Sequence, residues 1–178
     1  MLVVGVIAVV VAIVVALLMF SAMRRPDTFT VERRATIHAE PHTIFALLND
    51  FHEWGKWSPW EHLDPNMTRT HGGPDSGVGA SYAWSGNKRA GEGRMEILKS
   101  EPPSRLEIDL SFIKPFPSKN ITTFTLTPTG GGTEVNWHMQ GPASLMTKVF
   151  DMLMNMDKMV GKDFEQGLAN LKKVTEKA

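Results

Sequence analysis

Three carboxylates stand among three tryptophans in the segment DFHEWGKWSPWEH, and acid–base chemistry is conceivable there. The acids are Asp50, Glu53 and Glu61. A carboxyl group buried among apolar rings can act as a general acid or base, because burial favours its neutral form. The simpler interpretation places all three on the solvated face of a short helix or at its ends. We follow the simpler interpretation and predict no catalytic residue.

Metal chemistry would need ligands at a regular spacing, and the six histidines do not provide it. His38 and His42 are four residues apart, but Pro41 lies between them at a predicted strand-to-helix junction. They would therefore not share one helical face, as the histidines of an HExxH zinc site do. The chain has no cysteine, which excludes thiolate ligands and thiol nucleophiles. We predict no metal and no cofactor, and the other histidines are scattered: His52, His62, His71 and His138.

Phosphate-bearing ligands are also disfavoured. The stretch GVGAS, with Gly77 and Gly79, precedes a predicted strand and lacks the strand–loop–helix setting of a phosphate-binding loop. The sequence contains no GxSxG nucleophile motif. Its formal net charge is +0, whereas a nucleic-acid-binding protein usually carries a basic face. We therefore predict no nucleic-acid partner.

Apolar side chains are the remaining candidates, and the tryptophans come first. Trp54, Trp57 and Trp60 follow one another at intervals of three, so they would be neighbours on a helix surface. Each tryptophan buries about 150–250 Å². At about 25 cal/mol per Å² this is worth roughly 4–6 kcal/mol as an upper bound. They must therefore be covered, either as core that closes one end of a sheet or at the mouth of a ligand site.

Further apolar residues fall on predicted strands and on one face of the last helix, where they would meet across an interior. The 11 methionines of the chain suit a pliable surface that accepts varied ligands. Any single one of these residues could equally be plain core. The predicted lining of a cavity is Trp54, Trp57, Trp60, Trp84, Met95, Phe112, Phe124, Trp137, Met139, Met156, Val160 and Phe164.

Alternation of apolar and polar residues predicts an antiparallel sheet of about seven strands that would position this lining. The first strand covers Phe29–Ala39, where Arg33 falls on the apolar side and suggests a frayed edge or a bulge. The clearest strand runs through Leu106–Phe112. Hairpin turns are expected at SGNK, at EPPS and at Gly130–Gly132.

Helical spacing predicts the elements that cover the sheet. Pro41 opens a first helix, since proline suits the first helical position. The tryptophan segment forms a second short helix, broken at Ser58–Pro59. Residues 144–156 form another helical stretch or extend the last helix, and strands grouped apart from helices indicate an α+β fold. The long C-terminal helix carries an apolar stripe of Met156, Val160, Phe164, Gly167, Leu168, Leu171 and Val174.

The first twenty residues carry no charged side chain and predict a single-pass membrane anchor. At about 1.5 Å per residue they form about 30 Å of helix, enough for a bilayer core, whereas the apolar region of a signal peptide is shorter. We predict an anchor at residues 1–23, a linker at 24–28 and one domain at 29–178. Arg24 and Arg25 follow the apolar run, so the positive-inside rule places the domain in the cytoplasm.

Four segments carry a resemblance to a known superfamily: VERRATIHAEPHTIFALLNDFHEWGKWSPW, GVGASYAWSGNKRAGEGRMEI, TTFTLTPTGGGTEVNWHM and NMDKMVGKDFEQGLANLKK. From about Phe29 onward the chain resembles the START-like, or helix-grip, superfamily (SRPBCC). More narrowly, it is similar to the polyketide cyclase/dehydrase and lipid transport branch. The resemblance implies a curved sheet wrapped around the C-terminal helix, with a deep apolar cavity beneath it. It also favours Trp54 and Trp57 as structural residues, with Trp60 nearer the opening.

The function expected on these grounds is non-covalent binding or transport of a hydrophobic, lipid-like small molecule by a membrane-anchored domain. One alternative is a cyclase or dehydratase acting on a polyketide-like or aromatic substrate, which requires an ionisable residue pointing into the cavity. A second alternative is a protein-interaction module of the chaperone-cofactor type, which predicts a filled core and an exposed apolar patch. The expected partners are a hydrophobic small molecule or lipid, and the bilayer through residues 1–23.

Overall fold

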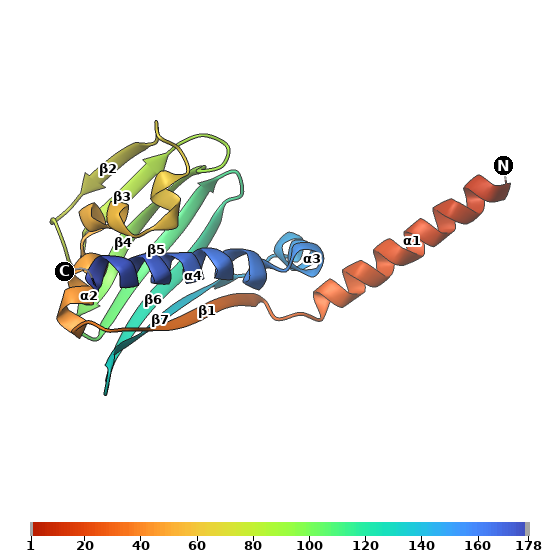
Figure 1. Cartoon of the computed structure of the whole chain (residues 1–178). Helices are drawn as coiled ribbons and strands as arrows, with labels where there is room; N and C mark the ends of the chain where they lie inside the picture. The colour runs from red at the N-terminus through yellow and green to blue at the C-terminus, as the bar shows by residue number, and fades with distance from the viewer. Residues whose placement is uncertain (1, 177–178) are drawn as a thin grey trace.

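Seven antiparallel strands form one curved sheet, and the C-terminal helix lies across its concave face (Figure 1). The computed structural model describes residues 2–176. The strand order is β1-β7-β6-β5-β4-β3-β2, so β2 to β7 follow one another as neighbours and β1 pairs with β7. The predicted α+β fold with about seven strands is confirmed. The strands are β1 (Thr28–Ile37), β2 (Thr68–Gly72), β3 (Ser81–Ser85), β4 (Glu92–Glu101), β5 (Arg105–Lys114), β6 (Ser118–Thr129) and β7 (Gly132–Pro142).

The hairpins lie where the sequence predicts them. SGNK begins the connection from β3 to β4, EPPS joins β4 to β5, and a glycine turn joins β6 to β7. Buried and exposed side chains alternate along the long strands. In β4, for example, Met95 and Ile97 are buried, whereas Arg94 and Glu96 are exposed. One face of the sheet therefore supplies core and the other meets solvent.

Three short helices cover part of the concave face: α2 (Pro41–Asn49), η1 (Phe51–Lys56) and η2 (Pro59–His62), the last two being three-ten helices. Pro41 occupies the start of α2, as predicted. The Asp50 carboxylate accepts a hydrogen bond from the backbone N–H of His52 and so caps η1. The predicted break at Ser58–Pro59 separates η1 from η2.

The helix held against the sheet is α4 (Met156–Thr175), and α3 (Leu145–Met154) precedes it as a separate helix. Asn155 separates them, with a φ of 53° in the left-handed region. Its side chain accepts a hydrogen bond from the N–H of Lys158 in the first turn of α4. The stripe of α4 differs from the prediction near its end, where Thr175 is buried and Val174 is only half-buried. The buried residues of α4 are Gly161, Phe164, Gly167, Leu168, Leu171 and Thr175.

Arg33 contradicts the expectation of a frayed edge or a bulge in the first strand. The register of β1 against β7 runs without a shift, and the Arg33 side chain crosses to α4. Its Nε donates to Glu165 at 2.7 Å and its Nη1 donates to Asp157 at 2.9 Å. These two carboxylates raise the pKa of Arg33, with Asp157 the larger cause. A Cβ on Gly161 would overlap the guanidinium, so the glycine makes room for this contact.

An apolar helix, α1 (Leu2–Met23), extends away from the domain (Figure 1). Within residues 2–176 it is the one helix long and apolar enough to cross a membrane, over Val3–Met23, and a signal sequence would meet the same criterion. Of its described side chains, Ala22 is buried and Leu18 half-buried, and the others are exposed. Residue 1 of the predicted anchor and residues 177–178 of the predicted domain lie outside the described residues.

Candidate functional site

Backbone registers place the inward-facing side chains in rows across the concave face, and the middle rows are closed. One row joins Arg33, Trp137, Phe124 and Leu106. The next row toward the start of β1 joins Val31, Met139, Thr122, Ile108 and Ile97. Apart from Arg33, every residue in these two rows is buried. The middle of the concave face therefore offers little surface to a ligand.

The aromatic side chains that cover these rows pack on one another. The ring of Trp137 stacks on Phe164 of α4, with centroids 4.1 Å apart. Trp57 meets Trp137 edge-on at 5.5 Å and lies 4.8 Å from Trp54. The indole N–H of Trp54 donates to the backbone oxygen of Leu48 at 3.0 Å. Five of the predicted lining residues thus fill the space beneath α4; we call them the closed cluster: Trp54, Trp57, Phe124, Trp137 and Phe164.

Trp60 lies at the border of this cluster. It is partly buried and meets Trp137 edge-on at 5.6 Å and Phe164 at 6.1 Å. The carboxyl group of Asp163 on α4 lies near its indole. Partial burial raises the pKa of the Asp163 carboxyl and the neighbouring Trp60 partly offsets this, while the residue as a whole is exposed. An indole and a carboxyl group therefore meet at the rim of the closed cluster.

The outermost inward-facing row is different, because it is half-exposed. It lies two rows beyond the row of Val31, past the row that contains Asn120 and Leu110. Trp84 and Phe112 lie on either side of Gly93 in this row, with ring centroids 5.8 Å apart. Phe112 is 37% exposed. A Cβ on Gly93 would overlap the indole of Trp84, so the glycine makes room for it. With half-buried Leu110 on the same face of β5, these residues form what we call the open end: Trp84, Leu110 and Phe112.

The other predicted lining residues lie elsewhere in the sheet or at the start of α4. Met95 and Met139 are buried in the sheet, at 8% and 5% exposure. Met156 and Val160 are half-buried in the first turns of α4. That end of α4 lies toward the start of β1, since Asp157 reaches Arg33 in the middle of the strand. The predicted lining therefore divides into a closed and an open part.

Asn120 is a residue that the sequence analysis missed. It stands opposite Leu110 and faces inward on β6, where it is 3% exposed. Its amide nitrogen donates to Ser118 at 3.3 Å, but its Oδ1 has no hydrogen-bond partner among residues 2–176. The sequence does contain a signal for it. Asn120 falls on every second position of β6 together with Thr122, Phe124 and Leu126, so alternation alone predicts that it faces inward. Beside the open end there is thus a buried acceptor without a donor.

Glu61 corrects the prediction that all three carboxylates near the tryptophans are solvated. It is 8% exposed, and its Oε1 accepts a hydrogen bond from Tyr82 at 2.6 Å. Its Oε2 accepts from Arg69 at 2.7 Å. Burial, followed by the bond to Glu61, raises the pKa of the Tyr82 hydroxyl. Both oxygens of Glu61 are engaged, so the carboxylate fastens η2 to β2 and β3 and is not free to act as a base.

The histidines form no site that would hold a metal ion. His52 and His71 stack at 4.1 Å, and His52 hydrogen-bonds to Asp50 at 2.8 Å. In the part of the chain that the structure describes, no group of three His, Cys, Asp or Glu side chains is arranged to bind a metal. His38 contacts the backbone oxygen of Gly131 instead of pairing with His42.

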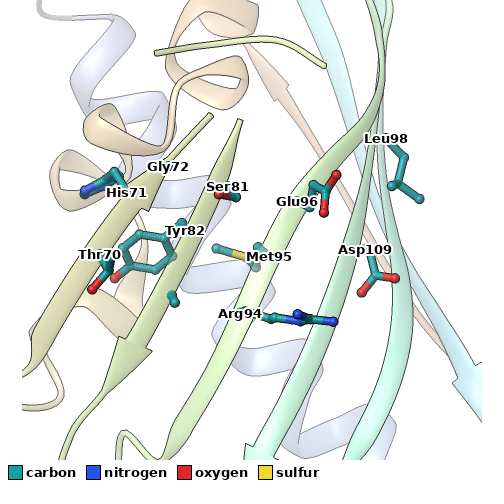
Figure 2. A pocket seen from close by; sticks show the side chains of 11 residues that line it. Thr70, His71, Gly72, Ser81, Tyr82, Arg94, Met95, Glu96, Leu98 and Asp109 are labelled. Carbon is teal, nitrogen blue, oxygen red and sulfur yellow. The ribbon is translucent and has the colours of Figure 1, made fainter. Parts of the chain in front are cut away.

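Two hollows lie on the outer face of the sheet, away from α4. The larger, of about 280 Å³, spans β2 to β5. Figure 2 shows Arg94, Glu96 and Asp109 projecting into it from neighbouring strands. The second, of about 200 Å³, adjoins it between Thr68 and Ile113. Charged side chains make the larger hollow unsuitable for an apolar ligand, and Trp84 of the open end borders the second. The half-exposed aromatic side chains on the concave face make the open end the candidate site.

A curved seven-stranded antiparallel sheet that holds a C-terminal helix against its concave face defines the helix-grip class of α+β domains. Here the class is combined with an apolar N-terminal helix. The chain belongs to the family described as polyketide cyclase / dehydrase and lipid transport, whose model matches residues 28–176. A comparison with curated proteins finds no match.

Solved structures share the fold at low sequence identity. Protein MLL2253 from Mesorhizobium loti is 20% identical with a TM-score of 0.62, over 84% of this chain and 98% of that one. DynU16, from the dynemicin biosynthetic locus, is 16% identical with a TM-score of 0.58, over 85% of this chain and 48% of that one. The Aha1 dimer from Colwellia psychrerythraea is 16% identical with a TM-score of 0.56, over 83% and 96%. At these identities the likeness concerns the fold alone.

Proposed function

We propose that this protein is a membrane-anchored domain that binds the apolar part of a lipid or lipid-like small molecule at the open end, without covalent chemistry. The observation that carries the proposal is the half-exposed pair of Trp84 and Phe112 at one end of the concave face, whose two middle rows are buried apart from Arg33. The lipid-transport part of the family description supports it, as does α1, which is long enough to span a bilayer.

The binding energy would come from burying apolar surface. Each 100 Å² of apolar surface that a ligand covers contributes about 2.5 kcal/mol before the cost of association. Trp84 is held in place by its N–H, which donates to the backbone oxygen of Ala90 at 3.0 Å. A fixed ring loses little conformational freedom when a ligand covers it. The Oδ1 of Asn120 lies against Gly141 and would accept a hydrogen bond from a hydroxyl or amide of the ligand once the side chain turns toward the open end.

Two neighbouring residues on β5 provide a matched test. Phe112 faces inward at the open end, while Ile113 faces outward and is 43% exposed. The full chain is purified in mild detergent as wild type, Phe112→Ser and Ile113→Ser, and the lipids it retains are extracted and quantified by mass spectrometry. We expect the first variant to lose a lipid species that wild type and the second variant keep. Equal lipid retention in all three proteins would overturn the proposal.

A cyclase or dehydratase is the second candidate function, and one observation favours it. Asp163, an exposed residue at the rim of the closed cluster, carries a carboxyl group whose pKa is raised by partial burial. Such a group could exchange a proton with a substrate held against Trp60. The fold of DynU16, from a biosynthetic locus, is compatible with this. Glu61 is a weaker candidate, because Tyr82 and Arg69 occupy both of its carboxylate oxygens.

An interaction module of the chaperone-cofactor type remains the third candidate. The closed cluster supplies the filled core that this function predicts, and the fold is shared with Aha1. The function would also need an exposed apolar patch that meets a protein. One such patch exists on α3, and its position relative to α1 indicates a different occupant, as argued below.

A further inference from the structure

One face of α3 is apolar and exposed, although the helix is firmly attached by its other face. Met146 is 80% exposed and Leu153 is 69% exposed. The buried side of the helix carries Lys148, whose ammonium donates to Asp27 at 2.6 Å in the chain between α1 and β1. The exposed apolar residues of α3 are Leu145, Met146, Phe150, Leu153 and Met154.

The position of α3 is set by the end of α1. The two helices are in contact, and Asp151 of α3 forms an ion pair with Arg25, two residues after α1 ends. Figure 1 shows α3 beside the point where α1 meets the domain. If α1 spans a bilayer, its last turns lie at the headgroup level and α3 lies beside them. Arg24 follows α1 with its guanidinium over the ring of Phe20 at 5.4 Å, which suits a position near anionic headgroups.

A second apolar element lies at the same end of the sheet. The loop from β5 to β6 carries Phe116, which is 79% exposed. Ser118, the first residue of β6, pairs with Phe112. Three residues later Ile121 pairs with Gln140 of β7, and Gln140 in turn pairs with Thr30 near the start of β1. The loop therefore lies at the α1 end of the sheet, as α3 does. Exposed aromatic side chains at that level are typical of a membrane–water interface.

We propose that α3 and the β5–β6 loop form a bilayer-contacting surface, with α3 lying as an interfacial helix in the leaflet where α1 ends. This inference rests on the anchoring part of the proposed function. An amphipathic helix with a polar side held to protein and an apolar side free is suited to the boundary between headgroups and acyl chains. The open end then faces the bilayer, because Phe112 leads directly into the loop that carries Phe116. An apolar ligand would pass between bilayer and domain without crossing water.

The absence of cysteine from the chain makes a direct test possible. Single cysteines replace Met154 on α3, Phe116 on the β5–β6 loop and Val78, and each is labelled with a polarity-sensitive fluorophore. Val78 is the matched control, since it is 60% exposed and precedes the start of β3. The open end lies at the other end of this strand, where Trp84 stands next to Ser85. The full chain is reconstituted in nanodiscs of phosphatidylcholine and phosphatidylglycerol, at one protein per disc. We expect emission at shorter wavelength for the labels at 154 and 116, and the emission of a water-exposed dye for the label at 78.

Water-like emission from all three labels, in protein that co-purifies with the discs, would overturn this inference and leave the anchor intact. Protein that fails to enter the discs would overturn both the anchor and the inference. A short-wavelength shift that appears only at several proteins per disc would show that a second copy covers the surface, which also overturns the inference. Lipid retention by Ile113→Ser and its loss in Phe112→Ser are measured separately, so the ligand site can fail or hold independently.

Discussion

At the scale of single residues, Asn120 is the most informative position in the candidate site. Its Oδ1 is buried on the concave face and lacks a hydrogen-bond partner in the described part of the chain, residues 2–176. A buried acceptor without a donor costs about 1–3 kcal/mol. Proteins keep such groups more often at functional sites than elsewhere, because function and stability compete there. The position should therefore affect stability and ligand binding in opposite directions.

We expect Asn120→Leu to raise the free energy of unfolding by about 1 kcal/mol, because leucine has a similar branched shape and no unsatisfied acceptor. The same variant should retain less of any hydroxyl-bearing lipid. Urea unfolding measures the first effect and mass spectrometry of the retained lipids the second. Thr122→Val, one inward position further along β6 and also buried, is the control and should leave lipid retention unchanged. A less stable Asn120→Leu variant with full lipid retention would assign Asn120 a purely structural role.

At the scale of elements, the strands and helices follow from local patterns in the sequence. Each local pattern involves only a few neighbouring residues, as in the alternation along β5, the glycine turn before β7 and the proline at the start of α2. The contacts of Arg33 and Glu61 could not be predicted from such local patterns, because their partners are distant in the sequence. The partners of Arg33 on α4 lie 124 and 132 residues further along the chain, so its inward position looked like an irregularity in β1.

The division of the site into closed and open parts could not be predicted from the sequence either. Apolar residues on facing elements look the same in a sequence whether they meet one another or a guest. The stacking of Trp137 on Phe164 at 4.1 Å depends on how closely α4 approaches the sheet, and Gly167 permits this approach. The residues expected to line a cavity were identifiable, while the space between them was not.

The attachment of η2 to the sheet gives the prediction that belongs to this scale. We expect Glu61→Gln to lower the free energy of unfolding by about 1–2 kcal/mol, because it removes the charge from the two hydrogen bonds that the buried Glu61 accepts from Arg69 and Tyr82. Glu53→Gln on the neighbouring η1 removes an exposed pair with Lys56 and should change stability by less than about 0.5 kcal/mol. Urea unfolding of both variants measures the difference. Similar small losses in both would mean that the Glu61 cluster does not hold η2.

At the scale of the whole molecule, the open end, α3, the β5–β6 loop and α1 all lie at one end of the sheet. The closed cluster and the covering helices η1 and η2 occupy the middle of the concave face. In the orientation proposed above, this arrangement would present the apolar surface toward the bilayer and keep the core sealed from it. The proposed tethering by α1 would keep the open end at a high local concentration of lipid.

This orientation predicts which of the five tryptophans senses the bilayer. Trp54, Trp57 and Trp137 are buried in the closed cluster and Trp60 lies at its border, whereas Trp84 is at the open end. In nanodiscs of lipids with brominated acyl chains, whose bromine atoms quench indoles only at close range, we expect partial quenching of the wild-type fluorescence. Trp84→Phe should lose most of the quenched fraction, and Trp60→Phe should keep it. Quenching that persists undiminished in Trp84→Phe would mean that the open end turns away from the membrane, and the route from bilayer to concave face would then be wrong.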